Sequence, residues 1–561
     1  MNKETERLKK EILAAGNSYV RQRRIEPLSV ESFMAFQING DRLAYETAYF
    51  ARRKQLAAVA LTYVYEKKQE TKEWLEQLIW EICNEYTWAL PAHLPNRTGL
   101  TEEDRRYIDL FAAETGQALA EITELVGDHL LPEITQRVRM EIERRLFFPF
   151  EQKKWAWEYK ENNWSAVIGG CIGMACLSML PVSSERSVKM IERLDQAMSS
   201  YLRGFKEDGA CVEGVGYWGY GFGYYIYYAK KLADKTGDRR YLEKKKVREV
   251  ARFPYYAQFN DSYLPFSDFS HAHLPSGLLS FCATAFSVPY AILHASRFDF
   301  DHCYRFAHLY RNLKWTVPAD SKLDQTNIRH YFSDAQWLIV HSFDHQLMFA
   351  TKGGDNLESH NHLDVGHFVF GNLTTLFLTD LGAGEYTKAY FDEQSRYDFF
   401  VTSASGHSLP IVNRSCQLPN GQSASSLFAD AETGKAGYDL TGTYGENAQL
   451  DRFHRCFFVD ESNRSVRIQD QFSFTQKKNE IIENFITRIK PTVQQENIRL
   501  TDGGEMCEIQ FEKKGLKHVQ IIERYFRDHH GDRQTAYQIQ ATYHVSKQAE
   551  ISIDFKLMDK G

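Results

Sequence analysis

The stretch of residues 46–69, ETAYFARRKQLAAVALTYVYEKKQ, decides how the first part of the chain folds. It runs for 24 residues without glycine or proline, and its apolar residues recur at mixed spacings of three and four. That spacing gathers apolar side chains on one face of a helix. We therefore predict a long helix here.

Similar segments lie on both sides of this stretch, and all are predicted to be helices. They cover residues 71–86, 102–126, 132–145, 166–180, 187–205 and 217–236. The loops between them are short and carry turn residues such as Pro91, Pro95 and Gly237. Helices of similar length in series are typical of a solenoid or of a closed α/α toroid, and no repeat in the residues decides between the two.

The pattern changes after about residue 318. Residues 452–460, 465–474 and 535–545 are rich in β-forming residues and partly alternate apolar with polar ones, and Asn, Asp and Gly separate such runs. This pattern indicates an antiparallel β-sandwich. We therefore predict one domain over residues 1–320 and a second over residues 321–561, with residues 410–450 as a long loop region with marginal strands.

The composition excludes several classes of protein. Hydrophobic residues make up 43% and charged residues 25% of the 561 residues, which excludes wholesale disorder, collagen and a coiled-coil rod. The net charge of −6 does not produce the overall positive potential that attracts nucleic acid. Nine cysteines without a C-x-x-C pair argue against a disulfide framework and a thiolate zinc site. The aromatic share of 14% would suit a groove for sugars.

Two further features suggest where the protein works. The first residues carry charges throughout and lack an apolar signal segment. The longest uncharged run, residues 167–182, is short for a membrane span and contains glycines and a proline. We therefore expect a cytoplasmic protein that does not bind a membrane.

The sequence SHNHLDVG at residues 359–366 contains a closely spaced pair of histidines. In an extended segment His360, His362 and Asp364 would share one face. Imidazole nitrogens and carboxylate oxygens are the ligands that a metal needs, and Asp380 and His407 are further candidates. The alternative is that the histidines form a polar edge and Asp380 a turn.

Two motifs in the helical part could serve a substrate. The amides of Asn162 and Asn163 and the indole of Trp164 stand at a helix start, where they could donate to a carboxylate, unless an asparagine only caps the helix. In the motif DGACVEGVGYWGY at residues 208–220, Tyr217 starts a helix and would point into any cavity that the loop borders. The same helix carries further tyrosines at residues 220, 224, 225, 227 and 228. The alternative, above all for residues 224–228, is that these rings only pack.

In their order and spacing these motifs resemble the heparinase II/III-like superfamily of polysaccharide lyases. The resemblance rests on Asn-Asn-Trp at 162–164, Asp-Gly-x-x-x-Glu-Gly-x-x-Tyr at 208–217 and His-Asn-His-x-Asp-x-Gly at 360–366, with Asp380 and the Ser-Gly-His at 405–407. It implies a multidomain α and β fold, in which an incomplete (α/α) toroid precedes an antiparallel β-sandwich.

The resemblance also implies an activity, which is β-elimination at a uronic acid. Asn163, with Asn162 as its neighbour, would neutralise the substrate carboxylate, and His360 would hold the same group or act on the C5 proton. Tyr217 would protonate the departing O4 and, with a nearby cation, serve as base. Tyr397 would be a second catalytic tyrosine.

Further roles follow from the same resemblance. Zinc would be held by His362, Asp380 and His407, in a structural and organising role. Trp164, His93, Glu213 and Arg396 are candidates for substrate binding. The alternatives are that His93 is a satisfied helix-end histidine and that Arg396 is a surface or structural residue. Several relatives have a base histidine beside the asparagine, where this chain has Trp164, so Tyr217, Tyr397 or His360 would be the base.

The expected partner is a short uronic-acid-containing oligosaccharide, cleaved from its end, and a homodimer is a further expectation. Two other readings remain open at this point. One is a toroidal glycoside hydrolase with Asp208 and Glu213 as its acid/base pair. The other is a non-catalytic carbohydrate-binding protein.

Overall fold

The computed structural model describes most of the chain, namely residues 3–95, 99–270, 273–289, 295–317, 326–357, 361–387, 389–392, 394–419, 423–494 and 497–558. The chain divides into two compact units. Unit 1 comprises Met1–Phe205, Gly216–Ala251 and His273–Asp320, and unit 2 comprises Lys206–Val215, Arg252–Ala272 and Ser321–Gly561. Two short segments of the first 320 residues, 206–215 and 252–272, thus belong to unit 2. A single domain boundary at residue 320 places both of them in the first domain instead.

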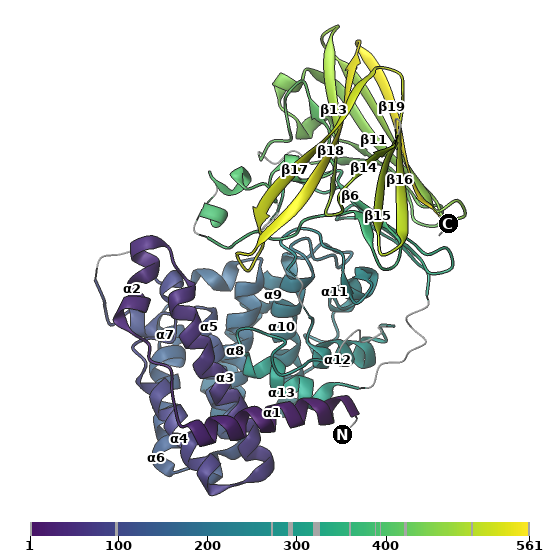
Figure 1. The fold of residues 1–561 in the computed structure, drawn as a ribbon. Coiled ribbons are helices and arrows are strands. Elements are labelled where there is room, and N and C mark those ends of the chain that lie inside the picture. Colours follow the sequence, from purple (N-terminus) through teal and green to yellow (C-terminus); the bar gives the residue numbers. More distant parts are fainter. Residues whose placement is uncertain are drawn as a thin grey trace. The chain divides into compact units, whose positions relative to one another are not determined.

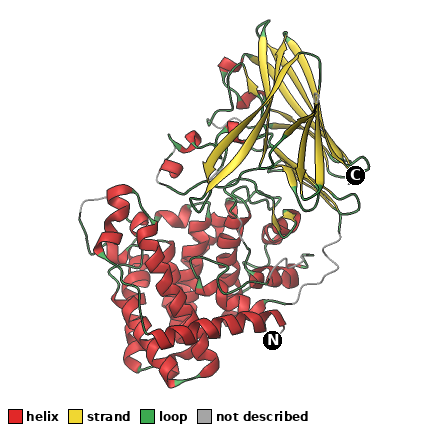
Figure 2. Cartoon of the chain, in the orientation of Figure 1, coloured by secondary structure: helices red, strands yellow, loops and turns green. Residues whose placement is uncertain are grey.

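Unit 1 is built from helices (Figures 1 and 2). They are α1 (Lys3–Gln22), α2 (Val30–Asn39), α3 (Leu43–Glu66), α4 (Gln69–Asn84), α5 (Leu110–Val126), α6 (Pro132–Ile142), α7 (Phe148–Gln152), α8 (Asn163–Met179), α9 (Glu185–Arg203), α10 (Val215–Thr236), α12 (Ser276–Phe286) and α13 (Phe306–Trp315). Helix α11 (Lys245–Tyr256) runs from residues of unit 1 into residues of unit 2.

Two predicted helix boundaries were wrong for identifiable reasons. Helix α3 ends before Lys67, which adopts the left-handed conformation at φ 54° and donates its N–H to Tyr63 O, so a lysine takes the place usually held by glycine. Helix α5 begins eight residues after the predicted start at residue 102. The Asp109 carboxylate accepts from the Ala112 N–H at 2.7 Å and so caps α5.

Unit 2 is built from antiparallel strands (Figure 2). A five-stranded sheet contains β3 (Ile328–Phe332), β4 (Trp337–Ser342), β5 (Leu347–Lys352), β6 (Phe368–Gly371) and β7 (Leu376–Leu378) in that order. A four-stranded sheet has the order β17 (Leu516–Arg527), β18 (Arg533–Val545), β13 (Asn479–Thr487), β8 (Ile411–Val412). A two-stranded hairpin joins β1 (Gln258–Phe259) and β2 (Ser262–Tyr263).

The largest sheet has eight strands and includes part of the region that was predicted to be mainly loop. Its order is β14 (Thr492–Gln494), β15 (Asn497–Asp502), β16 (Glu505–Phe511), β19 (Gln548–Met558), β12 (Ser465–Phe474), β11 (Leu450–Asp460), β10 (Lys435–Asp439), β9 (Ser425–Asp430). Strand β9 is mostly exposed, which explains why its sequence carries little strand signal.

A single apolar core joins these three sheets of unit 2. Phe368 of the five-stranded sheet contacts Phe485 of the four-stranded sheet and Phe555 of the eight-stranded sheet, with ring centroids 6.2 and 5.4 Å apart. The helical first part and the antiparallel sheets of the second part are confirmed. Closure of the helices into a toroid and a sandwich arrangement of the sheets remain predictions.

Across the parts of the chain that the structure describes, no helix combines the length and the apolar character needed to cross a membrane.

Candidate metal centre and catalytic residues

Four buried side chains of unit 2 meet at one point. His362 and Asp364 lie in irregular chain between β5 and β6, Asp380 lies two residues after β7, and His407 ends a short 3-10 helix, Ala404–Gly406. One ligand atom from each of the four lies within 4.8 Å of the others. The three predicted metal ligands, His362, Asp380 and His407, are therefore close together, with Asp364 beside them.

The hydrogen bonds of His407 determine which of its nitrogens carries the proton. Its Nδ1 lies 2.9 Å from the carbonyl oxygen of Ser403. Because a carbonyl can only accept, Nδ1 carries the hydrogen and Nε2 keeps its lone pair. Burial lowers the pKa of His407, which favours this neutral form.

The same reasoning applies to His362. Its Nε2 lies 3.0 Å from Asp268 Oδ1, so Nε2 donates to the carboxylate and Nδ1 keeps its lone pair. Nδ1 of His362 is 3.3 Å from Nε2 of His407. Two lone pairs therefore face each other, an arrangement that a shared cation would stabilise.

Asp380 brings a third acceptor to this point. Its Oδ1 accepts from the Gly382 N–H at 2.9 Å. Its Oδ2 is buried, has no hydrogen-bond partner among the described residues, and lies 3.6 Å from His407 Nε2. Burial raises the pKa of Asp380, and the nearby imidazoles and the Gly382 N–H offset this rise only in part.

His367 supports this cluster and was not identified from the sequence. Its Nδ1 accepts from the Ser408 N–H at 2.9 Å, so Nε2 carries the hydrogen, and Nε2 lies 3.5 Å from Asp380 Oδ2. Burial holds the pKa of His367 well below its usual value, so the ring is neutral. The only signal for it in the sequence was its position directly after Gly366, the last residue of the His-Asn-His-x-Asp-x-Gly motif.

Asp364 is the fourth member, and it differs from the others in having a cationic partner. Lys352 Nζ lies 2.8 Å from Asp364 Oδ2, and both side chains are buried. Burial opposes ionisation of Asp364, but Lys352 and the nearby imidazoles outweigh it and lower the pKa. The predicted period-two alternation does not hold here, because this segment is irregular, and His360 lies outside the described residues.

The donor set fits a divalent metal. Two imidazole nitrogens with free lone pairs and a carboxylate oxygen are ligands that zinc accepts, with Asp364 available as a fourth. The carboxylate on His362 and the carbonyl on His407 are the outer partners that fix the orientation of metal-binding histidines.

Arg396 and Tyr397 lie next to this cluster in unit 2. Arg396 is buried, and its guanidinium donates to Asp268 Oδ2 at 3.2 Å and to the carbonyl oxygens of Asn361 and Tyr390 at 3.1 Å each. The Tyr397 hydroxyl donates to Asn361 Oδ1 at 2.8 Å. Burial raises the pKa of Tyr397, although the charge of Arg396 lowers it in part.

The Asn-Asn-Trp motif starts helix α8 in unit 1. Asn162 is the N-cap, and its side chain accepts from the Trp164 N–H at 3.2 Å. Asn163 is only 8% exposed, yet its side-chain amide forms no hydrogen bond with another described residue. The capping alternative therefore applies to Asn162, and the Asn163 amide stays available.

His93 packs against this helix start. Its ring lies 5.3 Å from the Trp164 ring and 5.8 Å from the Phe111 ring, centroid to centroid. Its Nδ1 lies 2.8 Å from Asp109 Oδ2, which orients the ring. The structure thus brings two of the predicted substrate-binding residues, His93 and Trp164, together in unit 1.

The motif at residues 208–220 is divided between the two units. Tyr217 lies in the first turn of α10 and is half-buried, and Glu213, in unit 2, is half-buried too. The later tyrosines of α10, residues 224, 225, 227 and 228, are fully buried, as the packing alternative predicted. The Asp208 carboxylate accepts from the backbone N–H groups of Ala210, Asp334 and Ala335, at 2.8 to 3.1 Å.

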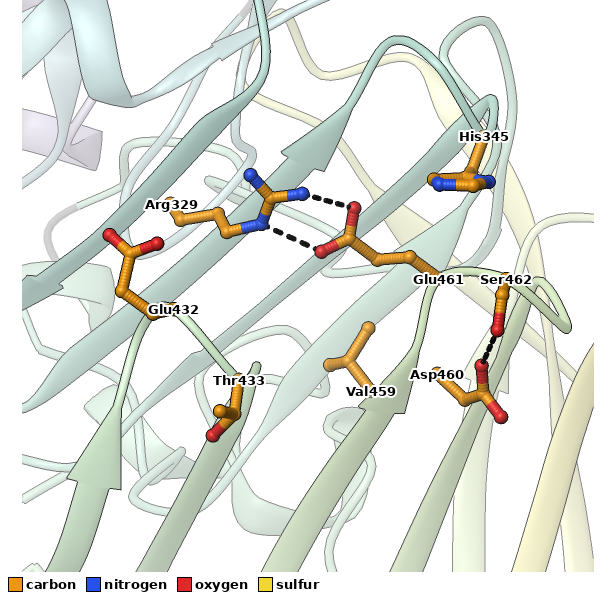
Figure 3. A pocket seen from close by; sticks show the side chains of 8 residues that line it. All are labelled: Arg329, His345, Glu432, Thr433, Val459, Asp460, Glu461 and Ser462. Carbon is orange, nitrogen blue, oxygen red and sulfur yellow. Dashed lines mark hydrogen bonds and ion pairs between the residues drawn. The ribbon is translucent and has the colours of Figure 1, made fainter.

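An open polar pocket of about 490 Å³ lies elsewhere in unit 2 (Figure 3). It is lined by Arg329, His345, Glu432, Thr433, Val459, Asp460, Glu461 and Ser462. Arg329 and Glu461 form a two-bond ion pair across it at 2.7 Å, so these two charges are already paired. None of the predicted site residues lines this pocket.

Comparison with solved structures identifies relatives of this fold. The chain is similar to heparinase III, with a TM-score of 0.66, 10% identity and coverage of 98% of this chain and 84% of the other. It is also similar to heparan sulfate lyase HepC from Pedobacter heparinus, with a TM-score of 0.62, 11% identity and coverage of 98% and 88%.

A chondroitin AC lyase from Streptomyces coelicolor is a further neighbour, with a TM-score of 0.51, 10% identity and coverage of 99% and 80%. No family model matches the chain, and no curated protein matches it in sequence. The resemblance to the heparinase-like lyases is therefore confirmed at the level of the fold.

Proposed function

We propose that this protein is a polysaccharide lyase that cleaves a glycosidic bond at a uronic acid by β-elimination, leaving a C4=C5 unsaturated uronate. The observation that carries the proposal is the buried cluster of His362, Asp380 and His407, whose free acceptor atoms converge as a metal site requires. It occurs in a fold that this chain shares with heparinase III and HepC.

The reaction first requires that the substrate carboxylate lose its effective charge, because the C5 proton is otherwise too weakly acidic. We assign this role to Asn163, which is mostly buried and whose side-chain amide has no described partner to compete with a substrate. Asn162 holds the helix start in place by capping α8. We assign His360 to the same carboxylate or to the C5 proton.

Proton transfer is assigned to tyrosines. Tyr217 would take the C5 proton or protonate the departing O4, and in a syn elimination one tyrosine would do both. Tyr397 is assigned as a proton donor, since its raised pKa keeps the hydroxyl protonated at neutral pH.

Zinc is the proposed metal, and it would supply fixed positive charge that holds the ligand-bearing loops together. His362 Nδ1, His407 Nε2 and Asp380 Oδ2 would hold it. We assign the metal an organising role, with no step of the elimination at the ion itself. Trp164 and His93 would pack against a sugar ring. Glu213 and Arg396 are also assigned to substrate binding. Arg396 would act indirectly, by holding the backbone at Asn361 and Tyr390 in place.

The hydrolase alternative finds no support at its proposed acid. The Asp208 carboxylate accepts from three backbone N–H groups, which hold it in a turn and leave it poorly placed to act on a substrate. The more detailed proposals, namely exolytic action on oligosaccharides, a cytoplasmic location and a homodimer, rest on the sequence argument alone.

The test is a panel of uronate-containing glycans, each incubated with the purified protein and followed by ultraviolet absorbance. Elimination creates a conjugated double bond that absorbs, whereas hydrolysis does not. We expect absorbance to rise on at least one glycan with the wild type and not with Tyr217→Phe. Glycan binding without any product in both proteins would instead establish the non-catalytic carbohydrate-binding alternative.

A further inference from the structure

We propose that Asp268 is a positioning residue that couples the metal centre to the segment carrying Tyr397. This inference rests on the metal site of the proposed function. It assigns Asp268 two linked effects: it fixes the orientation of His362, and it transmits metal binding to residues 394–399.

The first observation is the environment of the Asp268 carboxylate, which is buried in unit 2 with no exposed side-chain surface. It accepts from His362 Nε2 at 3.0 Å and from the Tyr390 hydroxyl at 2.5 Å, both on Oδ1. Arg396 Nη2 donates to both oxygens at 3.3 and 3.2 Å. One carboxylate therefore holds donors from two separate chain segments.

The second observation concerns charge. An isolated buried carboxylate would be costly, but the Arg396 guanidinium lies against Asp268 and compensates it. Asp268 and Arg396 are thus neutral together, and they leave the negative charge of Asp380 free to balance a cation. Asp268 acts on the metal site through the His362 ring, which is the usual way that an outer carboxylate acts on a metal ligand.

The third observation is the path from Asp268 to Tyr397. Arg396 also donates from Nε to the Asn361 carbonyl oxygen and from Nη1 to the Tyr390 carbonyl oxygen. Asn361 in turn accepts the Tyr397 hydroxyl on Oδ1 and is the residue before His362. A movement of His362 therefore shifts Asn361, its neighbour in the chain, and also Arg396, through Asp268. Both residues belong to the hydrogen-bonded network that includes Tyr397.

The geometry assigns opposite roles to the two nitrogens of His362. With Asp268 present, Nε2 carries the hydrogen and Nδ1 faces the metal. Without the carboxylate, neither the tautomer nor the ring orientation is fixed. Loss of such an outer partner weakens metal binding by roughly 10- to 100-fold.

The experiment measures zinc binding to the full chain by competition with a chromophoric chelator. We compare the wild type with Asp268→Asn, which keeps the shape but loses the charge. Glu121→Gln is the matched control, because Glu121 is a buried carboxylate paired with Arg311 in unit 1. We expect a zinc Kd weaker by roughly 10- to 100-fold in Asp268→Asn and unchanged in Glu121→Gln.

Hydrogen exchange tests the coupling to Tyr397. In the wild type, zinc should slow exchange at residues 394–399, and Arg396→Lys should lose this effect while retaining its zinc Kd within about threefold. A single ammonium keeps the charge but lacks the planar fork that reaches Asp268 and two carbonyls at once. Melting in the presence of a chelator establishes that each variant is folded before zinc is added.

Three results would overturn the inference. Wild-type zinc affinity in Asp268→Asn would show that the charge of the carboxylate does not act on the metal site through His362. Zinc binding without any change in exchange at residues 394–399 would remove the coupling. If the wild type itself binds no zinc, the proposed metal site fails, and the role of Asp268 fails with it.

Discussion

The two units each contain a buried cluster of charged and polar side chains, and the two clusters differ in what they lack. In unit 1, Glu121 accepts from both terminal nitrogens of Arg311 and from Lys231, all at 2.9 Å. In unit 2, His362 Nδ1, His407 Nε2 and Asp380 Oδ2 are all acceptors. The first cluster contains its own cations. In the second, no described residue donates a hydrogen bond to Asp380 Oδ2, and the nearest N–H, on His367 Nε2, stays 3.5 Å away.

This difference separates a structural ion pair from a ligand site. Buried polar groups in proteins are nearly always satisfied, so a buried group without a partner calls for a specific reason. Burial alone cannot supply the reason, because both clusters are buried. The distinguishing property is the balance of donors and acceptors, and the predictions below test it in the two units.

The largest expected effect is in unit 1. Arg311→Met removes the main cation from Glu121 and should lower the free energy of unfolding by about 3–5 kcal/mol, because it leaves a poorly compensated buried charge. Urea denaturation would measure this loss. Added zinc should not restore the lost stability. Recovery of wild-type stability by zinc would mean that the unit 1 cluster is also a ligand site and that the two clusters do not differ in this property.

The pH dependence of the same cluster is the next largest effect. Although burial opposes ionisation, Arg311 and Lys231 lower the pKa of Glu121 from 4.5 to about 2. The folded pKa is depressed, so the stabilisation is complete above 4.5 and is lost as pH falls toward about 2, amounting to about 3 kcal/mol. As the pH falls, the wild type should lose this stability and Glu121→Gln should not. Free energies of unfolding that fall in parallel with pH in the two proteins would contradict the assignment.

In unit 2 the expected effect depends on metal. Zinc at 100 times its Kd should stabilise the wild type by about 2.7 kcal/mol, and His407→Ala should lose this gain, because one of the three converging acceptors is removed. Thermal melting with zinc and with chelator would measure both. An equal gain in both proteins would show that zinc binds elsewhere on the chain.

The smallest expected effect concerns the segment next to the cluster. Tyr397→Phe removes the hydrogen bond to Asn361 Oδ1 and should cost about 0.5–1.5 kcal/mol of stability. Its effect on turnover should be larger, because the proposed proton donor is lost. A variant that melts earlier but keeps its full rate of product formation would remove Tyr397 from the catalytic assignment.

Much of the fold could be predicted because it depends on local periodicity. The stretch at residues 46–69 has the spacing of a helix, and α3 is there. The end of α3 could not be predicted, because Lys67 adopts the left-handed conformation that glycine usually takes. The exposed strand β9 could not be predicted either, since it buries too little apolar surface to show alternation.

The metal cluster could be predicted only in part. Resemblance and spacing selected His362, Asp380 and His407, which the structure brings together. The sequence did not identify Asp268, because it lies more than ninety residues before His362 and belongs to no motif. Its role depends on the return of a segment near residue 268 to unit 2, which is a tertiary property that no local pattern encodes.

The central claim, that the protein breaks its substrate by elimination, is tested most directly by carrying out the reaction in water enriched in heavy oxygen. The proposal predicts an ultraviolet-absorbing unsaturated product, with heavy oxygen entering the new reducing end no faster than it exchanges into a free reducing sugar under the same conditions, judged by mass spectrometry. Incorporation of one heavy oxygen for each bond cleaved, without the absorbance, would demonstrate hydrolysis and contradict the account.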